Sequence, residues 1–162
     1  MGQQQLLLLT LSIVIVGLSV TSGIQAYTEN TTKAALERSA LEAIRLATSA
    51  IAWKAKPTAL GGGLGRDYLT GITLGNLGYP VSGADGLSDY YTHSQTRLRI
   101  TDTDTAVPIV HARDLTEAYT VVRVYMFGPT ENCLAIRTSV RTQNNRDQWI
   151  ETPTIPPTCD GW

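Results

Sequence analysis

No charged side chain occurs between Met1 and Thr28, and an apolar run from Leu6 to Ile24 fills most of this segment. Such a run approaches the ~20 apolar residues that an α-helix needs to cross the hydrocarbon core of a membrane. Every Lys, Arg, Asp and Glu lies from Glu29 onward, and the rest of the chain has the composition of an ordinary polar domain. The 162 residues therefore have room for one apolar extended element and one compact domain.

The apolar segment has three interpretations. A secretory signal peptide has a basic start and a small-x-small cleavage site, whereas no Lys or Arg precedes the run and Ile24-Gln25-Ala26 fits poorly. A plain membrane anchor usually has flanking positive charge, but the first charges here are Glu29 and then Lys33. The third interpretation is a longer helix, of which the apolar run is only the first half.

The residues after the run favour this longer helix. No proline occurs between Met1 and Lys56. Apolar and small residues recur at helical spacing along one face: Leu36, Ala40, Ala43, Ile44, Ala47, Ala50 and Ile51. Pro57 ends the pattern. We predict a helix from about Gln3 to Lys56, in a first domain of residues 1–56. Its first half requires apolar surroundings on all sides, and its amphipathic second half requires one packing partner.

Residues 57–162 predict a β-rich head. A Gly-rich connector of roughly thirty residues comes first; it lacks the Gly-Lys-Ser/Thr ending of a P-loop and is expected to form a surface loop that lies over neighbouring subunits. Strand patterns then follow at 97–101, 116–127, 134–141 and 149–150. Turns are expected at Gly128-Pro129 and Asn144-Asn145. We expect an antiparallel meander of about four strands on the amphipathic half of the helix, an α+β fold.

The chain has two cysteines, Cys133 and Cys159. Next to a membrane-type segment, such a pair is typical of one disulfide in an oxidising compartment, and we consider two free buried thiols the weaker alternative. A bridge would hold down the Pro-rich tail around Pro156 and stabilise the fold by roughly 3–4 kcal/mol in the chain-entropy model.

No pattern of catalytic, cofactor-binding or metal-binding residues stands out. The two histidines, His93 and His111, do not fit the spacing of a metal site or a catalytic set. A net charge of −1 gives no indication of a nucleic-acid partner. Asn30-Thr31-Thr32 is an N-glycosylation sequon. We therefore expect a protein that is not an enzyme and has no cofactor.

Three features together resemble a type IV pilin: the start MGQQQLLLLTLSIVIVGLSVTSGIQAY, the proline-free run to Lys56, and the late cysteine pair. The resemblance implies a structural subunit of an extracellular helical filament. It implies storage as a single span of the inner membrane before assembly, packing on identical copies, and help from type IV pilus-like assembly machinery. The residues it assigns to the filament core are Gln5, Leu6, Leu9, Ile13, Val16, Gly17, Val20 and Gly23.

The chain departs from that family at position five, where type IV pilins usually have a glutamate and this sequence has Gln5. In the family the carboxylate is thought to neutralise the N-terminal amine of a neighbour. An amide can accept a hydrogen bond from an amine but cannot cancel its charge. The alternative function is a single-pass, membrane-anchored extracytoplasmic module, or a pseudopilin-like component of a secretion system.

Overall fold

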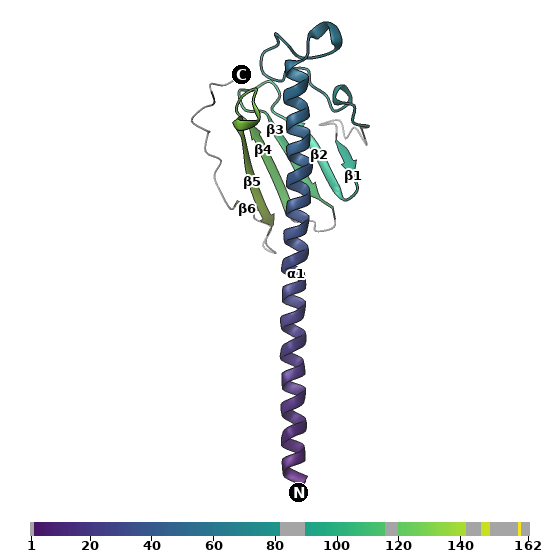
Figure 1. The fold of residues 1–162 in the computed structure, drawn as a ribbon, viewed down its shortest axis with the longest axis vertical. Helices are drawn as coiled ribbons and strands as arrows, with labels where there is room; N and C mark the ends of the chain where they lie inside the picture. Colours follow the sequence, from purple (N-terminus) through teal and green to yellow (C-terminus); the bar gives the residue numbers. More distant parts are fainter. Residues whose placement is uncertain (1, 82–89, 116–119, 142–146, 150–158, 160–162) are drawn as a thin grey trace. The chain divides into compact units, whose positions relative to one another are not determined.

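The structure is a computed structural model, which describes residues 2–81, 90–115, 120–141, 147–149 and 159. The chain divides into two compact units, an N-terminal unit of residues 1–34 and a head unit of residues 35–162. The division falls inside one helix, α1 (Gly2–Ala55) (Figure 1). The amphipathic half of the predicted helix therefore belongs to the same compact unit as the strands.

Helix α1 confirms the helix expected from the sequence, and its ends lie within one residue of the predicted ones. Its burial changes along its length. Between Gly2 and Asn30 all residues are exposed. In the head unit one face is buried, through Ala35, Ser39, Ala43, Leu46, Ala47, Ala50, Ile51 and Trp53. The recurrence of small residues on this face lets the helix lie close to the sheet.

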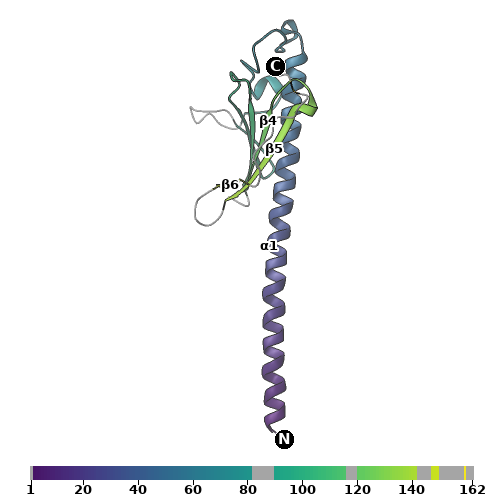
Figure 2. The same cartoon turned by 90° about the vertical axis from the view of Figure 1, so that its left-hand side faces the viewer.

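The strands form one six-stranded antiparallel sheet in the order β1-β2-β3-β4-β5-β6, which is a simple meander. Figures 1 and 2 show one face of this sheet against the second half of α1. The strands are β1 (Tyr91–His93), β2 (Thr96–Thr101), β3 (Ile109–Asp114), β4 (Thr120–Met126), β5 (Leu134–Arg141) and β6 (Asp147–Trp149). The expected α+β class and the meander are confirmed.

The expectation of about four strands was too low, because the sequence patterns missed β1 and β3. Strand β1 has only three residues, too few for a visible alternation. Strand β3 reads IVHARD, and its core-facing positions include the carboxylate of Asp114. A buried acid in an otherwise apolar row hides the alternation that marks a strand.

The core of the head unit lies between α1 and the inner face of the sheet. It consists mainly of Ala43, Leu46, Ala47, Ala50 and Trp53 from the helix and Leu98, Val110, Ala112, Val122, Val124 and Met126 from the strands. Leu46, Val110, Val122 and Val124 have no exposed surface. In β4 the alternation is complete, since Thr120, Val122, Val124 and Met126 are buried and the residues between them are half-buried.

The Gly-rich connector is more than the surface loop that its composition predicts. It contains two short 3-10 helices, η1 (Thr58–Leu60) and η2 (Gly75–Leu77), and it supplies Leu69, Ile72 and Leu74 to the core. Its glycines permit this close packing, because a Cβ on Gly63 would collide with the ring of Trp53. The Trp53 indole in turn donates a 2.9 Å hydrogen bond to the Gly61 carbonyl.

Some predictions fall outside the described residues. They are the Asn144-Asn145 turn, the first four residues of the strand expected at 116–127, residue Ile150 and the Pro-rich tail around Pro156.

Candidate functional site

The N-terminal unit exposes a continuous apolar surface. Its twelve Leu, Ile and Val side chains between Leu6 and Ile24 are each more than half exposed, from 51% to 69%. No charged residue interrupts this surface before Glu29. Isolated exposed aliphatic residues are normal on soluble proteins, but a contiguous patch of this extent marks a surface that contacts lipid or protein.

Exposing this surface to water carries a large free-energy cost. Burying an aliphatic side chain stabilises a protein by about 1.5–3 kcal/mol, so leaving twelve of them in water costs on the order of 20 kcal/mol. Whole domains are stable by only about 5–15 kcal/mol. The candidate site is therefore the apolar surface itself.

Four polar side chains of this surface have internal hydrogen-bond partners. The hydroxyls of Thr10 and Ser12 donate to the carbonyls of Leu7 and Leu8, at 2.9 and 2.8 Å. Ser19 and Thr21 do the same with carbonyls three or four residues earlier, at 2.8 and 2.9 Å. Hydroxyls bonded in this way need no partner from water, so they add little to the cost of entering an apolar medium.

The residues assigned to the filament core all lie exposed on α1 in the N-terminal unit: Gln5, Leu6, Leu9, Ile13, Val16, Gly17, Val20 and Gly23. Six of them, from Leu6 to Gly23, follow a 3-4-3-4-3 spacing, the spacing of a seam between supercoiled helices. A Cβ placed on Gly17 or Gly23 would meet no other atom within 4 Å. Because glycine has no side chain, another helix can approach the backbone closely at these two positions. Asn30 is also exposed on α1.

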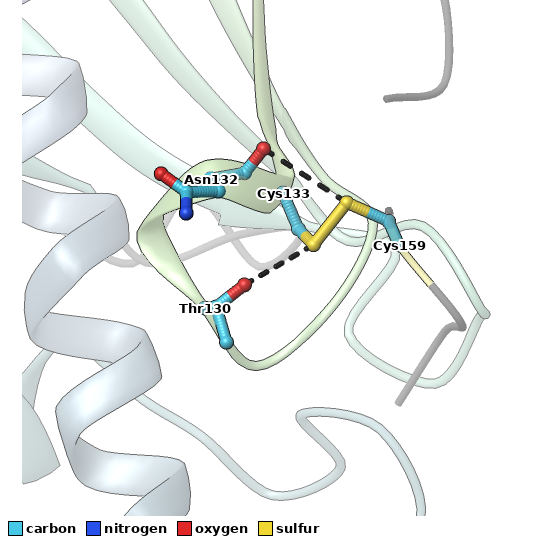
Figure 3. Close-up of a disulfide and its surroundings, with 4 residues drawn as sticks. All are labelled: Thr130, Asn132, Cys133 and Cys159. Carbon is cyan, nitrogen blue, oxygen red and sulfur yellow. Dashed lines mark hydrogen bonds between the residues drawn. A yellow bond between two sulfur atoms is a disulfide. The ribbon is translucent and has the colours of Figure 1, made fainter. Parts of the chain in front are cut away.

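The disulfide expected from the sequence is present. Cys133 and Cys159 are bonded, with Cα atoms 5.6 Å apart and a sequence separation of 26. Figure 3 shows the bridge beside the short η3 helix (Glu131–Cys133), where the Thr130 hydroxyl donates to Cys133 Sγ at 3.2 Å. Cys159 Sγ lies 3.9 Å from the Asn132 carbonyl oxygen. The bridge fixes position 159 to the start of β5 (Leu134–Arg141).

An ion pair with one buried partner, which sequence reasoning missed, joins the helix to the sheet in the head unit. The Arg38 guanidinium donates to Asp114 Oδ2 at 2.8 Å and to Gln95 Oε1 at 2.9 Å. Asp114 has no exposed side-chain surface, whereas the Arg38 side chain is 41% exposed. Nothing in the sequence indicates that Asp114 is buried, because an acidic residue directly after an arginine usually lies in a solvent-exposed segment.

The two histidines lie on different parts of the head unit. His93 Nδ1 is 3.2 Å from Glu42 Oε1. His111 lies on the sheet face away from α1, and its Nε2 is 3.0 Å from the Thr101 hydroxyl. Among the residues that the structure describes, no three His, Cys, Asp or Glu side chains are grouped so as to hold a metal ion.

By length and composition α1 is able to cross a membrane, as an anchor or as a signal sequence. No residue of the apolar stretch is buried, which distinguishes it from the core helix of a soluble protein. Comparisons with protein-family models, with curated proteins and with solved structures found no match to this chain. Its function is therefore inferred from its own residues.

Proposed function

We propose that this chain is the structural subunit of an extracellular helical filament of the type IV pilus kind. The N-terminal unit is stored as a single membrane span and then packs on copies of itself, while the head unit lies outside. The observation that carries the proposal is the charge-free, exposed apolar surface between Leu6 and Ile24 on a helix that continues unbroken to Ala55.

The same surface suits both environments. Lipid tails are as apolar as aliphatic side chains, so a helix that leaves the membrane for a bundle of identical helices exchanges one apolar contact for another. The closeness of the packing then decides whether the helix is more stable in the bundle than in the membrane, because packed protein atoms gain dispersion energy that loose lipid contacts do not provide. The open space at Gly17 and Gly23 favours such a fit.

Two further observations support a filament subunit with an external head. The nearest basic residue after the apolar run is Lys33, well beyond Ile24, so the span lacks the close basic flank of an ordinary anchor. The Cys133–Cys159 bridge favours a head in an oxidising compartment outside the cytosol. Identical subunits that join head-to-tail without closing a ring form a helical fibre.

The test is a single charge in the middle of the apolar surface. Val16→Glu adds a cost of about 3 kcal/mol to membrane insertion. The favourable insertion free energy of the remaining eleven aliphatic side chains is larger than this cost. In a filament core the same change places an unpaired carboxylate in every subunit. We therefore expect Val16→Glu to leave the chain in the membrane fraction but to abolish fibres. Val16→Leu is the matched control and should keep both properties.

The assay is electron microscopy of material sheared from producing cells, with mass spectrometry of the main protein. Fibres of the wild-type chain and of Val16→Leu, with none from Val16→Glu, are the expected result. Wild-type chains that come out of the membrane only as single copies in detergent would instead identify a membrane-anchored module or a pseudopilin-like component, and the proposal would fail.

A further inference from the structure

The sheet face away from α1 is unusually rich in arginine. The strand register places Arg97 opposite Arg113 and Arg99 opposite His111. His111 is in turn opposite Arg123, and Arg123 is opposite Arg137. We call this surface the arginine face; its arginines are Arg97, Arg99, Arg113, Arg123 and Arg137. Adjacent strands lie about 4.8 Å apart, so four strands gather these charges on one small surface.

The net charge of −1 conceals this cluster. The chain has 13 basic and 14 acidic residues, and five of the basic ones lie on the arginine face. The rest of the chain then holds 8 basic residues against 14 acidic ones. Like charges directly opposite each other on neighbouring strands are destabilising. Such an arrangement is therefore suited to a function that needs the charge.

Arg97 and Arg99 carry the inference, because both are exposed. Among the described residues neither forms an ion pair with a carboxylate. Arg113, Arg123 and Arg137 each have further interactions within the chain, so they are not used as ligands here. Burial lowers the pKa of His111 to about 4, and Arg99 and Arg123 lower it further than Asp102 raises it.

Aromatic rings lie among the arginines. The Arg97 guanidinium lies 4.3 Å from the centre of the Tyr90 ring. Tyr125 shares the same side of β4 as Arg123 and is half-buried. With a pKa of about 4, His111 is a neutral ring near pH 7 between Arg99 and Arg123. The arginine face therefore brings guanidinium groups together with planar rings, which supply both charge and stacking partners.

We propose that the arginine face binds single-stranded nucleic acid, with phosphates on Arg97 and Arg99 and bases against the neighbouring rings. Guanidinium groups fit phosphate oxygens with two parallel hydrogen bonds. Bases stack on aromatic side chains without regard to sequence. The binding does not depend on polymerisation, since all of its residues belong to one head unit.

The test uses the full chain as single copies in non-ionic detergent, with a fluorescein-labelled 30-mer of thymidine followed by fluorescence anisotropy. The variant is Arg97→Gln with Arg99→Gln. The matched control is Arg45→Gln with Lys56→Gln, two exposed basic residues of the head unit away from the sheet face. Both pairs lower the net charge by two. Circular dichroism and tryptophan fluorescence verify that each variant is folded.

We expect the Kd to rise at least tenfold for the Arg97/Arg99 variant and less than twofold for the control. The slope of log K against log salt should shrink by about 1.4, because each lost single-strand phosphate contact removes about 0.7. Equal losses in the two variants, or no wild-type binding at 50 mM NaCl, would overturn the proposal. Stronger competition by polygalacturonate than by unlabelled oligothymidine, at equal charge, would identify an acidic glycan as the ligand instead.

Discussion

The ion pair of Arg38 and Asp114 predicts an asymmetric response to mutation. The two partners differ in exposure: the carboxylate is fully buried, and the guanidinium side chain is 41% exposed. Removing the arginine takes one cation away from a carboxylate that stays buried, whereas removing the acid leaves a cation that water reaches. The two changes delete the same 2.8 Å contact but should lower the free energy of unfolding by different amounts.

The magnitudes follow from that difference. Arg38→Met retains the apolar stem that packs on the head unit but leaves the Asp114 carboxylate buried, which should cost about 3 kcal/mol. Asp114→Asn keeps the volume and an acceptor oxygen and introduces no buried charge, so it should cost about 1 kcal/mol. Arg45→Met on the same helix, at an exposed position, is the control and should change stability by less than about 0.5 kcal/mol.

Urea unfolding in non-ionic detergent at pH 7, followed by tryptophan fluorescence, measures all three variants. Trp53 reports on the head unit because it is only 5% exposed. If Arg38→Met lowers the free energy of unfolding by no more than Asp114→Asn does, the carboxylate does not depend on this arginine. The reasoning from burial would then be refuted.

Three further outcomes are expected. Replacing Cys133 and Cys159 with serine should lower the free energy of unfolding by about 3–4 kcal/mol, since the bridge closes a long loop. In urea unfolding, wild type treated with reductant should have the same free energy of unfolding as this double variant. The pKa of His111 is about 4 when folded and 6.5 when unfolded, so only the unfolded chain takes up a proton as the pH falls through this window. Between pH 6.5 and 4 the free energy of unfolding of wild type should therefore fall by about 2 kcal/mol more than that of His111→Gln, after allowance for partial exposure of the ring. Parallel plots of this free energy against pH for the two proteins would contradict the prediction. Gly63→Ala should cost about 1–3 kcal/mol, because its Cβ would overlap the Trp53 ring; an unchanged melting temperature would show that the ring moves aside.

The sequence alone determined the features that depend on neighbours in the chain. Helix α1 follows from a proline-free run with helical periodicity and a proline after it, and its bounds were predicted within one residue. The exposed apolar surface follows from the lack of charge before Glu29. The disulfide follows from there being only two cysteines.

Only the tertiary structure decided the features that depend on strand register. Arg97, Arg113, Arg123 and Arg137 are spread over about forty positions, and each is ordinary in its own strand. They share a face because antiparallel pairing brings them into neighbouring rows. Asp114 likewise resembles a surface residue until the register turns it toward α1. Local periodicity determines which residues alternate, but the partner strand and the covering helix determine which side is buried.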